Sequence, residues 1–273
     1  MALFDFHIHS YFSDGTFAPA EIVRLAKKQN ITQMALTDHD NVLGLDEAEI
    51  EANKAGIKFI RGIEISSKDE DCPVIHMLGY HIKDNGALEE IITENAETLR
   101  ERNGRIIKFL RENYGFDINI DDFYRACKGS VGKGNLAQYL TNAGYTKTFR
   151  ESEDLMRPYN AGAYGVDAKR AIKAIHNAGG LAFLAHPNNL KKSDDVLLLK
   201  IKEFVGYGLD GVECFHSNFS NEQSELYLKY AKLLNLKISG GSDFHGEFKP
   251  NVRLGYGKGD NPLLKNEFIS IDE

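Results

Sequence analysis

The sequence lacks several features that would assign it to a specialised class of protein. Among its 273 residues are only three cysteines, Cys72, Cys127 and Cys214, which are far apart and odd in number, so a disulfide framework is not expected. It has no apolar run long enough to span a bilayer and no basic or apolar leader. These absences favour a cytoplasmic protein without a membrane partner.

Positive charge is also scarce. The chain carries 33 Lys and Arg residues against 40 Asp and Glu residues, which gives a formal net charge of −7. A broad surface for duplex nucleic acid needs clustered basic residues, so stable duplex binding is not expected. A small anion could still bind at a local positive site. The length is sufficient for one large α/β domain or two small ones.

Short apolar runs alternate with amphipathic stretches along most of the chain. This alternation predicts an α/β protein with a parallel sheet and crossover helices, either a barrel or an open sheet. We expect strands over 3–9, 31–40, 57–66, 73–82, 181–187, 209–216 and 236–245. We expect helices over 19–29, 44–56, 167–180, 193–208 and 221–235.

The middle of the chain departs from this alternation. Residues 87–115 have the periodicity of one or two long helices, and the stretch that follows is polar and rich in Gly and Tyr, with weak periodicity. We therefore predict a helical insertion over 87–165. The remaining residues, 1–86 and 166–273, would form the main domain.

The stretch "DFHIHSYFSDG", residues 5–15, concentrates histidine and aspartate near the first expected strand. Side chains alternate along a strand, so His7 and His9 are expected on one face with Asp5, while the apolar residues between them face the core. Such alternation also arises by chance in an ordinary packed strand, and that alternative stays open for this motif alone.

Histidines recur at the ends of the expected strands. Because the carboxyl ends of strands form the ligand face of α/β sheets and barrels, these side chains should meet with the neighbouring Asp38, Asp40, Glu64 and Asp243. Nitrogen and carboxylate ligands together suit Zn, Mn or Fe. The alternative is a set of unrelated buried histidines. Seven of the nine histidines follow this pattern: His7, His9, His39, His76, His186, His216 and His245.

Six motifs occur in order along the chain: "HIHSYFSDG", "LTDHD", "GIEIS", "IHMLGY", "LAHP" and "GSDFH". Together they resemble the PHP (polymerase and histidinol phosphatase) family of metal-dependent phosphoesterases, and its nucleotide phosphatase and trpH-like branch in particular. The resemblance implies a distorted seven-stranded, TIM-like β/α barrel with a helical insertion, and a metal centre at its C-terminal face.

The resemblance also implies a ligand set for two to three divalent ions. The first ion would be held by His7, His9, Glu64 and Asp243. Glu64 would bridge to a second ion held with His76 and His186, and a third would be held by Asp14, His39 and His245. Two metals can lower the pKa of a shared water, which would make a metal-bridging hydroxide the nucleophile. Asp38 and Asp40 would hold imidazoles in place, and Asp38 is also a candidate catalytic residue.

The chain departs from the family at the insertion. Relatives usually have Gly-Arg-Pro-His there, whereas this chain has "VGKGN", with Lys133 in place of arginine and Asn135 in place of histidine. Lysine keeps the positive charge, but its ammonium group lacks the bidentate hydrogen bonding of a guanidinium. We expect Lys133 and Asn135 to contact substrate, unless Lys133 is a solvated loop residue.

His216, in "GVECFHS", matches a family position that faces the substrate. It could bind substrate and protonate the leaving group at its usual pKa, or it could be a structural residue in the wall of the barrel.

The expected function is hydrolysis of small phosphate monoesters, with nucleotides or short oligonucleotide ends as substrates. Histidinol-phosphate phosphatase is the alternative within the same family. Metal-dependent amide or amidine hydrolysis is less favoured, because no strand offers a suitable lysine. A non-catalytic metal-binding module that serves a partner also remains open.

Overall fold

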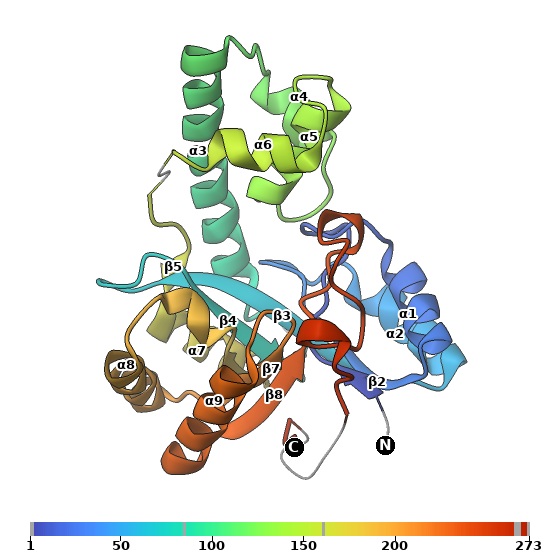
Figure 1. Ribbon diagram of the computed structural model, residues 1–273, viewed down its shortest axis with the longest axis vertical. Coiled ribbons are helices and arrows are strands. Elements are labelled where there is room, and N and C mark those ends of the chain that lie inside the picture. The colour runs from blue at the N-terminus through green and yellow to red at the C-terminus, as the bar shows by residue number, and fades with distance from the viewer. Residues whose placement is uncertain (1–2, 84–85, 160–161, 265–268, 272–273) are drawn as a thin grey trace.

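The computed structural model describes residues 3–83, 86–159, 162–264 and 269–271, so the outer ends of the two expected main-domain segments lie outside the described residues. It has an α/β fold with one mostly parallel sheet (Figure 1). The strand order is β1-β2-β3-β4-β6-β7-β8, with β5 paired to β3. The strands are β1 Leu3–Asp5, β2 Ile31–Leu36, β3 Lys58–Lys68, β4 Ile75–Tyr80, β5 Val166–Asp167, β6 Leu181–Leu184, β7 Gly211–His216 and β8 Lys237–Gly241.

Five helices pack beside the sheet, in two groups. Figure 1 shows α1 and α2 on one side of it and α7, α8 and α9 on the other. Local signals set their ends: Pro19 begins α1, and Gly56 ends α2 with φ 69°, where a side chain would be strained. The helices are α1 Pro19–Lys28, α2 Leu45–Ala55, α7 Ala168–Asn177, α8 Asp194–Tyr207 and α9 Asn221–Leu234. In the described residues, no helix is both long and apolar enough to cross a bilayer.

The expectation of a parallel sheet is wrong for one strand. β4 pairs antiparallel with β3 and with β6. The reason is the connection: only residues 69–74 separate β3 from β4, which is too short for the crossover that a parallel pair needs.

The expected closed barrel is not confirmed, because the strand ladders end at β1 and β8. The chain beyond these two strands does approach: Phe6 N donates to Gly240 O at 3.2 Å, and Asp243 N donates to His7 O at 2.9 Å. The first strand ends at Asp5 and the last at Gly241, so both are shorter than expected. Asp243 has φ 57°, which is incompatible with a continuous extended strand.

Four further helices lie together at one end of the molecule, beyond the sheet (Figure 1). The long helix predicted at the start of the insertion is α3, and Gly115 ends it with φ 70°. Three shorter helices, which the weak periodicity did not predict, pack against it around their own apolar core, with Phe123, Leu136 and Leu140 fully buried. The helices are α3 Glu89–Tyr114, α4 Ile120–Arg125, α5 Lys133–Asn142 and α6 Phe149–Met156.

Candidate metal centre

The carboxylate of Glu64, within β3, lies at the centre of a cluster of imidazoles. Its side chain is fully buried, and each of its two oxygens faces a different group of rings. Oε2 lies near three nitrogens: His7 Nε2 at 3.1 Å, His9 Nε2 at 3.2 Å and His39 Nδ1 at 3.3 Å. Oε1 lies near two: His76 Nδ1 at 3.0 Å and His186 Nε2 at 2.9 Å. One carboxylate thus joins five imidazoles.

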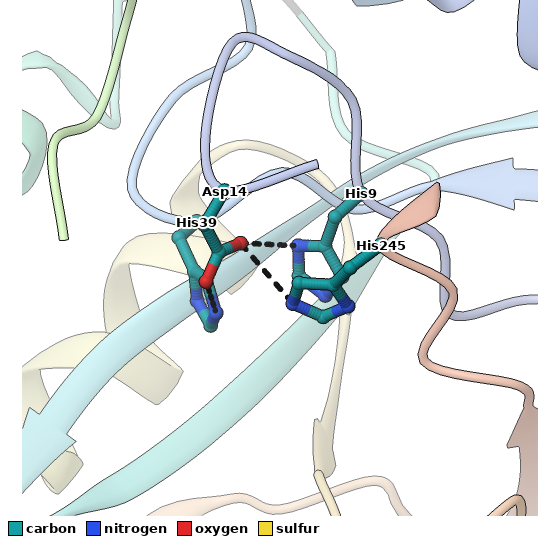
Figure 2. A group of neighbouring side chains, drawn as sticks. All are labelled: His9, Asp14, His39 and His245. Carbon is teal, nitrogen blue, oxygen red and sulfur yellow. Dashed lines mark ion pairs between the residues drawn. The ribbon is translucent and has the colours of Figure 1, made fainter. Parts of the chain in front are cut away.

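Two more carboxylates extend the cluster. Asp243 Oδ1 is 3.3 Å from His9 Nε2 and 3.6 Å from His7 Nε2. Asp14 Oδ1 is 3.2 Å from His245 Nε2 and 3.8 Å from His9 Nδ1, and its other oxygen is 3.9 Å from His39 Nε2. Figure 2 shows Asp14 on its loop facing His39 on one side and the pair His9 and His245 on the other.

The sheet brings these residues together because most of them follow the carboxyl ends of its parallel strands. His39 follows β2, His186 follows β6, and Asp243 and His245 follow β8. His76 lies at the start of β4, but this strand is antiparallel, so its start meets the carboxyl ends of its neighbours.

The loop after His9 is shaped by Asp38. Asp38 Oδ1 accepts hydrogen bonds from Ser10 N and from Ser13 Oγ, both at 2.7 Å, and Oδ2 accepts one from Ser10 Oγ at 2.7 Å. Gly15 closes the turn against His9, where a side-chain carbon would lie 2.3 Å from the His9 carbonyl oxygen. These contacts direct Asp14 back toward the imidazoles. A catalytic role for Asp38 stays a prediction, since its bonds are with serines and its link to His9 runs through Ser13.

Asp40 also bonds to neighbours other than imidazoles. Its Oδ1 accepts hydrogen bonds from Ser66 N at 2.8 Å and from Asn95 Nδ2 at 2.6 Å. Asn95 lies on α3, so this buried carboxylate links the helical segment to β3 next to Glu64.

Glu213 on β7 was not predicted from the sequence, although it lies in a quoted motif. It is fully buried; its Oε1 lies 2.9 Å from His7 Nδ1, and its Oε2 accepts a hydrogen bond from His186 N at 2.8 Å. A carboxylate in an otherwise apolar strand was the available signal. The contact fixes the ring of His7 and the backbone of His186, whose φ of 26° is unusual.

In the cluster, neighbouring charged groups counteract the effect of burial on the pKa values of Glu64 and His9. Burial would raise the pKa of Glu64, but the imidazoles of His39, His7 and His76 hold it well below its usual range. Burial likewise disfavours charge on His9, yet Asp243 and Glu64 raise its pKa to about 9. Burial lowers the pKa of His39 to about 3. The pKa values of the rings are thus shifted in opposite directions within one cluster.

The donor set fits divalent metal ions. Three buried atoms have no hydrogen-bond partner: His9 Nε2, His39 Nδ1 and Asp14 Oδ1. Each nevertheless lies 3.2–3.3 Å from another ligand atom, which is Glu64 Oε2 for the two imidazoles and His245 Nε2 for Asp14. Buried polar atoms that face one another without bonding are typical of ligands that share an ion. Ligand atoms lie within 4.8 Å of one another in the groups His9–Asp14–His39–His245, His7–His9–Asp243 and His39–Glu64–His76.

The cluster opens on a cavity of about 220 Å³. Its lining includes His39, His76, His186 and Asp243 of the cluster, and Phe149 and Glu153 of the helical segment. Lys249, which no sequence pattern indicated, also lines it and places Nζ 2.5 Å from Asp243 Oδ2.

A second cavity of about 160 Å³ adjoins the first and shares Asp14, His39 and His76 with it. Lys133 and Asn135, at the start of α5, line this second cavity. Asn135 Nδ2 donates to Ser13 O at 2.6 Å and its Oδ1 accepts from Gly132 N at 2.8 Å, so its amide joins the helical segment to the loop that carries Asp14.

His216 adjoins the cluster, near His7 and Glu213, but it lines neither cavity. Its Nδ1 accepts a hydrogen bond from Asn218 N at 3.0 Å, its Nε2 is 3.5 Å from Asp243 Oδ2, and its ring stacks on Phe219. Its expected contact with substrate stays a prediction.

Comparisons with known proteins agree on one family. The PHP domain model matches residues 5–249. A 5′-3′ exoribonuclease of Haemophilus influenzae is 32% identical over 89% of each chain. A 3′,5′-nucleoside bisphosphate phosphatase of Chromobacterium violaceum is 27% identical over 97% of this chain and 95% of its own. Among solved structures, a Bifidobacterium adolescentis protein described as a metal-dependent phosphoesterase has a TM-score of 0.82 and 29% identity, over 95% of this chain and 92% of that one.

Proposed function

Since this chain belongs to the PHP family and is a metal-dependent phosphoesterase, we propose that it releases phosphate from nucleotides or from the ends of short oligonucleotides. The named activities of the two relatives support this choice, because both act on phosphate esters of nucleotides or RNA. The observation that carries the proposal is the placement of Glu64 between two groups of imidazoles below an open polar cavity.

Nine side chains of the cluster would hold two to three divalent ions, with Mn, Fe or Zn as the expected metals. We assign Glu64 as the ligand shared between ions, because its two oxygens face separate groups of rings. Ions held there would lower the pKa of a bound water and would stabilise negative charge on the phosphoryl oxygens. The proposed ligands are His7, His9, Asp14, His39, Glu64, His76, His186, Asp243 and His245.

The remaining residues of the site would position these ligands and the substrate. Glu213 fixes the ring of His7 through its 2.9 Å contact with Nδ1, and Asp38 holds the loop that presents Asp14. Lys133 would attract the substrate phosphate from the side of the helical segment.

We further propose that residues 87–165 act as a cap. The segment reaches the metal-facing cavity through Phe149 and Glu153, and the stacking of Phe149 on Phe248, 4.7 Å between ring centres, joins it to the loop after β8. A substrate in the cavity would therefore lie between the metal ligands and the helices. The cap would select among phosphate esters and keep bulk water from the reacting group.

A substrate panel tests the proposal. Protein reconstituted with Mn should release phosphate from mononucleotides and from 5′-phosphorylated oligonucleotides faster than from histidinol phosphate. Faster hydrolysis of histidinol phosphate would favour the alternative within the family. Absence of phosphate release from every ester, in protein whose metal content is normal, would favour a non-catalytic module.

A further inference from the structure

Among the described residues, Asp243 is the one proposed metal ligand whose carboxylate pairs with a lysine. The ion-pair partners found there for the carboxylates of Glu64 and Asp14 are all imidazoles. Asp243 instead has Lys249 beside its Oδ2, with Nζ at 2.5 Å. An ammonium group in this position opposes the binding of a metal ion to the same carboxylate, so its place in the site calls for a physical reason.

The two oxygens of Asp243 have different neighbours. Oδ1 lies 3.3 Å from His9 Nε2 and 3.6 Å from His7 Nε2, which are proposed ligands of the same ion. Oδ2 lies beside Lys249 and 3.5 Å from His216 Nε2. Lys249 therefore holds the oxygen that would otherwise be available to join Oδ1 in binding that ion.

The loop that carries Lys249 is fixed on two sides. Gly246 has φ 66° and packs against Thr16 so closely that a side-chain carbon would lie 2.1 Å from Thr16 Oγ1. Lys249 N donates to Gly246 O at 3.2 Å. On the other side, Phe248 stacks on Phe149 of α6 with 4.7 Å between ring centres. These contacts begin within three residues of Lys249, so the backbone places its side chain beside Asp243.

The number of carboxylate oxygens on an ion decides how many positions stay open. A carboxylate can bind a cation through one oxygen or through both. An ion that takes part in hydrolysis needs an open position for water or substrate, and a second oxygen from Asp243 would fill one. Asp243 and Lys249 both line the metal-facing cavity, so a position kept open beside them would be accessible to substrate.

We propose that Lys249 is a positioning residue that holds Oδ2 of Asp243 away from the ion shared with His7 and His9. Asp243 then binds this ion through one oxygen, and a coordination position stays open for water or for a phosphoryl oxygen. The inference rests on the proposed function and adds to it a residue that lowers metal affinity in favour of turnover.

Two measurements on the same variants test the proposal: titration of the metal-free protein with Mn, and turnover at saturating Mn on the nucleotide that the wild type hydrolyses fastest. Lys249→Met should bind one Mn ion about tenfold more tightly, because a neighbouring cation lowers the affinity of a carboxylate for a proton by about one to three orders of magnitude. Its turnover should nevertheless fall by about tenfold or more, because the open position is lost. A residue that only supports the fold would weaken both.

Two further variants at the same position sharpen the result. Lys249→Arg keeps the charge beside Oδ2 and should retain the Mn affinity and most of the turnover of the wild type. Lys249→Gln keeps an N–H donor without the charge, and its Mn affinity and turnover should lie between those of the wild type and Lys249→Met. It also covers the case in which Lys249→Met folds poorly.

Lys192→Met is the matched control. Lys192 is also a half-buried lysine paired with an aspartate, 3.4 Å from Nζ to Asp71 Oδ2, but it lines neither cavity. Its substitution should leave both the Mn affinity and the turnover unchanged.

Unchanged or weaker Mn binding in Lys249→Met would overturn the proposed role of Lys249 and leave the proposed function intact. Tighter binding without a loss of turnover would also overturn it, as would tight binding and slow turnover in Lys249→Arg. A wild type that binds Mn but hydrolyses no nucleotide would instead contradict the proposed function on which the inference rests.

Discussion

The sheet region and the helical segment are stabilised in different ways. Around Glu64, the sheet region buries charged and polar side chains whose positions are fixed several times over, as His7 is by contacts with Glu64 and Glu213. The helical segment has its own apolar core around Phe123. It meets the sheet region through Leu88 and Ile91, which belong to the apolar core of the sheet, through polar contacts such as Asn135 with Ser13, and through the stacking of Phe149 on Phe248. We infer from this difference that the proposed metal ligands depend mainly on the sheet region, and that changes in the apolar core of the helical segment would leave most of them in place.

The largest effect is expected from a substitution in the sheet region, at Glu64. Glu64→Gln should lower phosphate release by about 10³-fold or more, because an amide cannot replace a carboxylate shared between metal ions. Bound metal should fall as well, which elemental analysis measures. His7→Ala, which would remove a proposed ligand of one ion, should have a smaller effect than Glu64→Gln. Near-normal activity in both variants would mean that the site lies elsewhere.

A substitution of Lys133 should weaken the catalytic efficiency on the substrate and should leave the metal content unchanged. Lys133→Ala should lower kcat/KM on nucleotides by about 10- to 150-fold, the effect of losing one charge-assisted hydrogen bond. Lys133→Arg should retain or increase activity. Lys128→Ala is the matched control, because Lys128 is an exposed lysine of the same segment that lies over Tyr11 outside both cavities. Lys133 lies in α5 and is half-buried, so it is not the solvated loop residue of the alternative. A change below about twofold for Lys133→Ala would show that it does not act on the substrate.

The smallest effect is expected at Asn135, where the two regions are joined. Asn135→Ala removes the hydrogen bond to Ser13 O and should lower kcat/KM by up to about tenfold, through less exact placement of Asp14. Asn142→Ala on the same helix is the control, since within the described residues the Asn142 side chain bonds only Gln138, whose Nε2 donates to Asn142 Oδ1. A loss at Asn135 as large as that at Glu64 would contradict the division between the regions.

Sequence reasoning succeeded where a local pattern determines the outcome. Helix ends at Pro19 and Gly56 follow from backbone preferences of single residues, and the long helix α3 follows from its apolar period. Histidines at strand ends were expected to meet because strand ends in one sheet share an edge. Five of them lie around Glu64, and their role as metal ligands stays a prediction: His7, His9, His39, His76 and His186.

What the sequence could not provide depends on contacts between distant parts of the chain. The antiparallel direction of β4 differs from the prediction, because strand propensity carries no information on direction, whereas the length of the connection after β3 does. Glu213 escapes prediction for a related reason. It looks ordinary in its own strand and becomes informative only when its contacts with His7 and His186 are seen in space.

The central claim is that the cluster around Glu64 is a metal centre, and elemental analysis of the purified protein tests it most directly. After supplementation with Mn or Fe, the protein should carry two to three transition-metal ions per chain and should lose phosphate release when these are removed by a chelator. The same measurement on Glu64→Gln should show a clear decrease. Less than about one ion per supplemented wild-type chain would contradict the account.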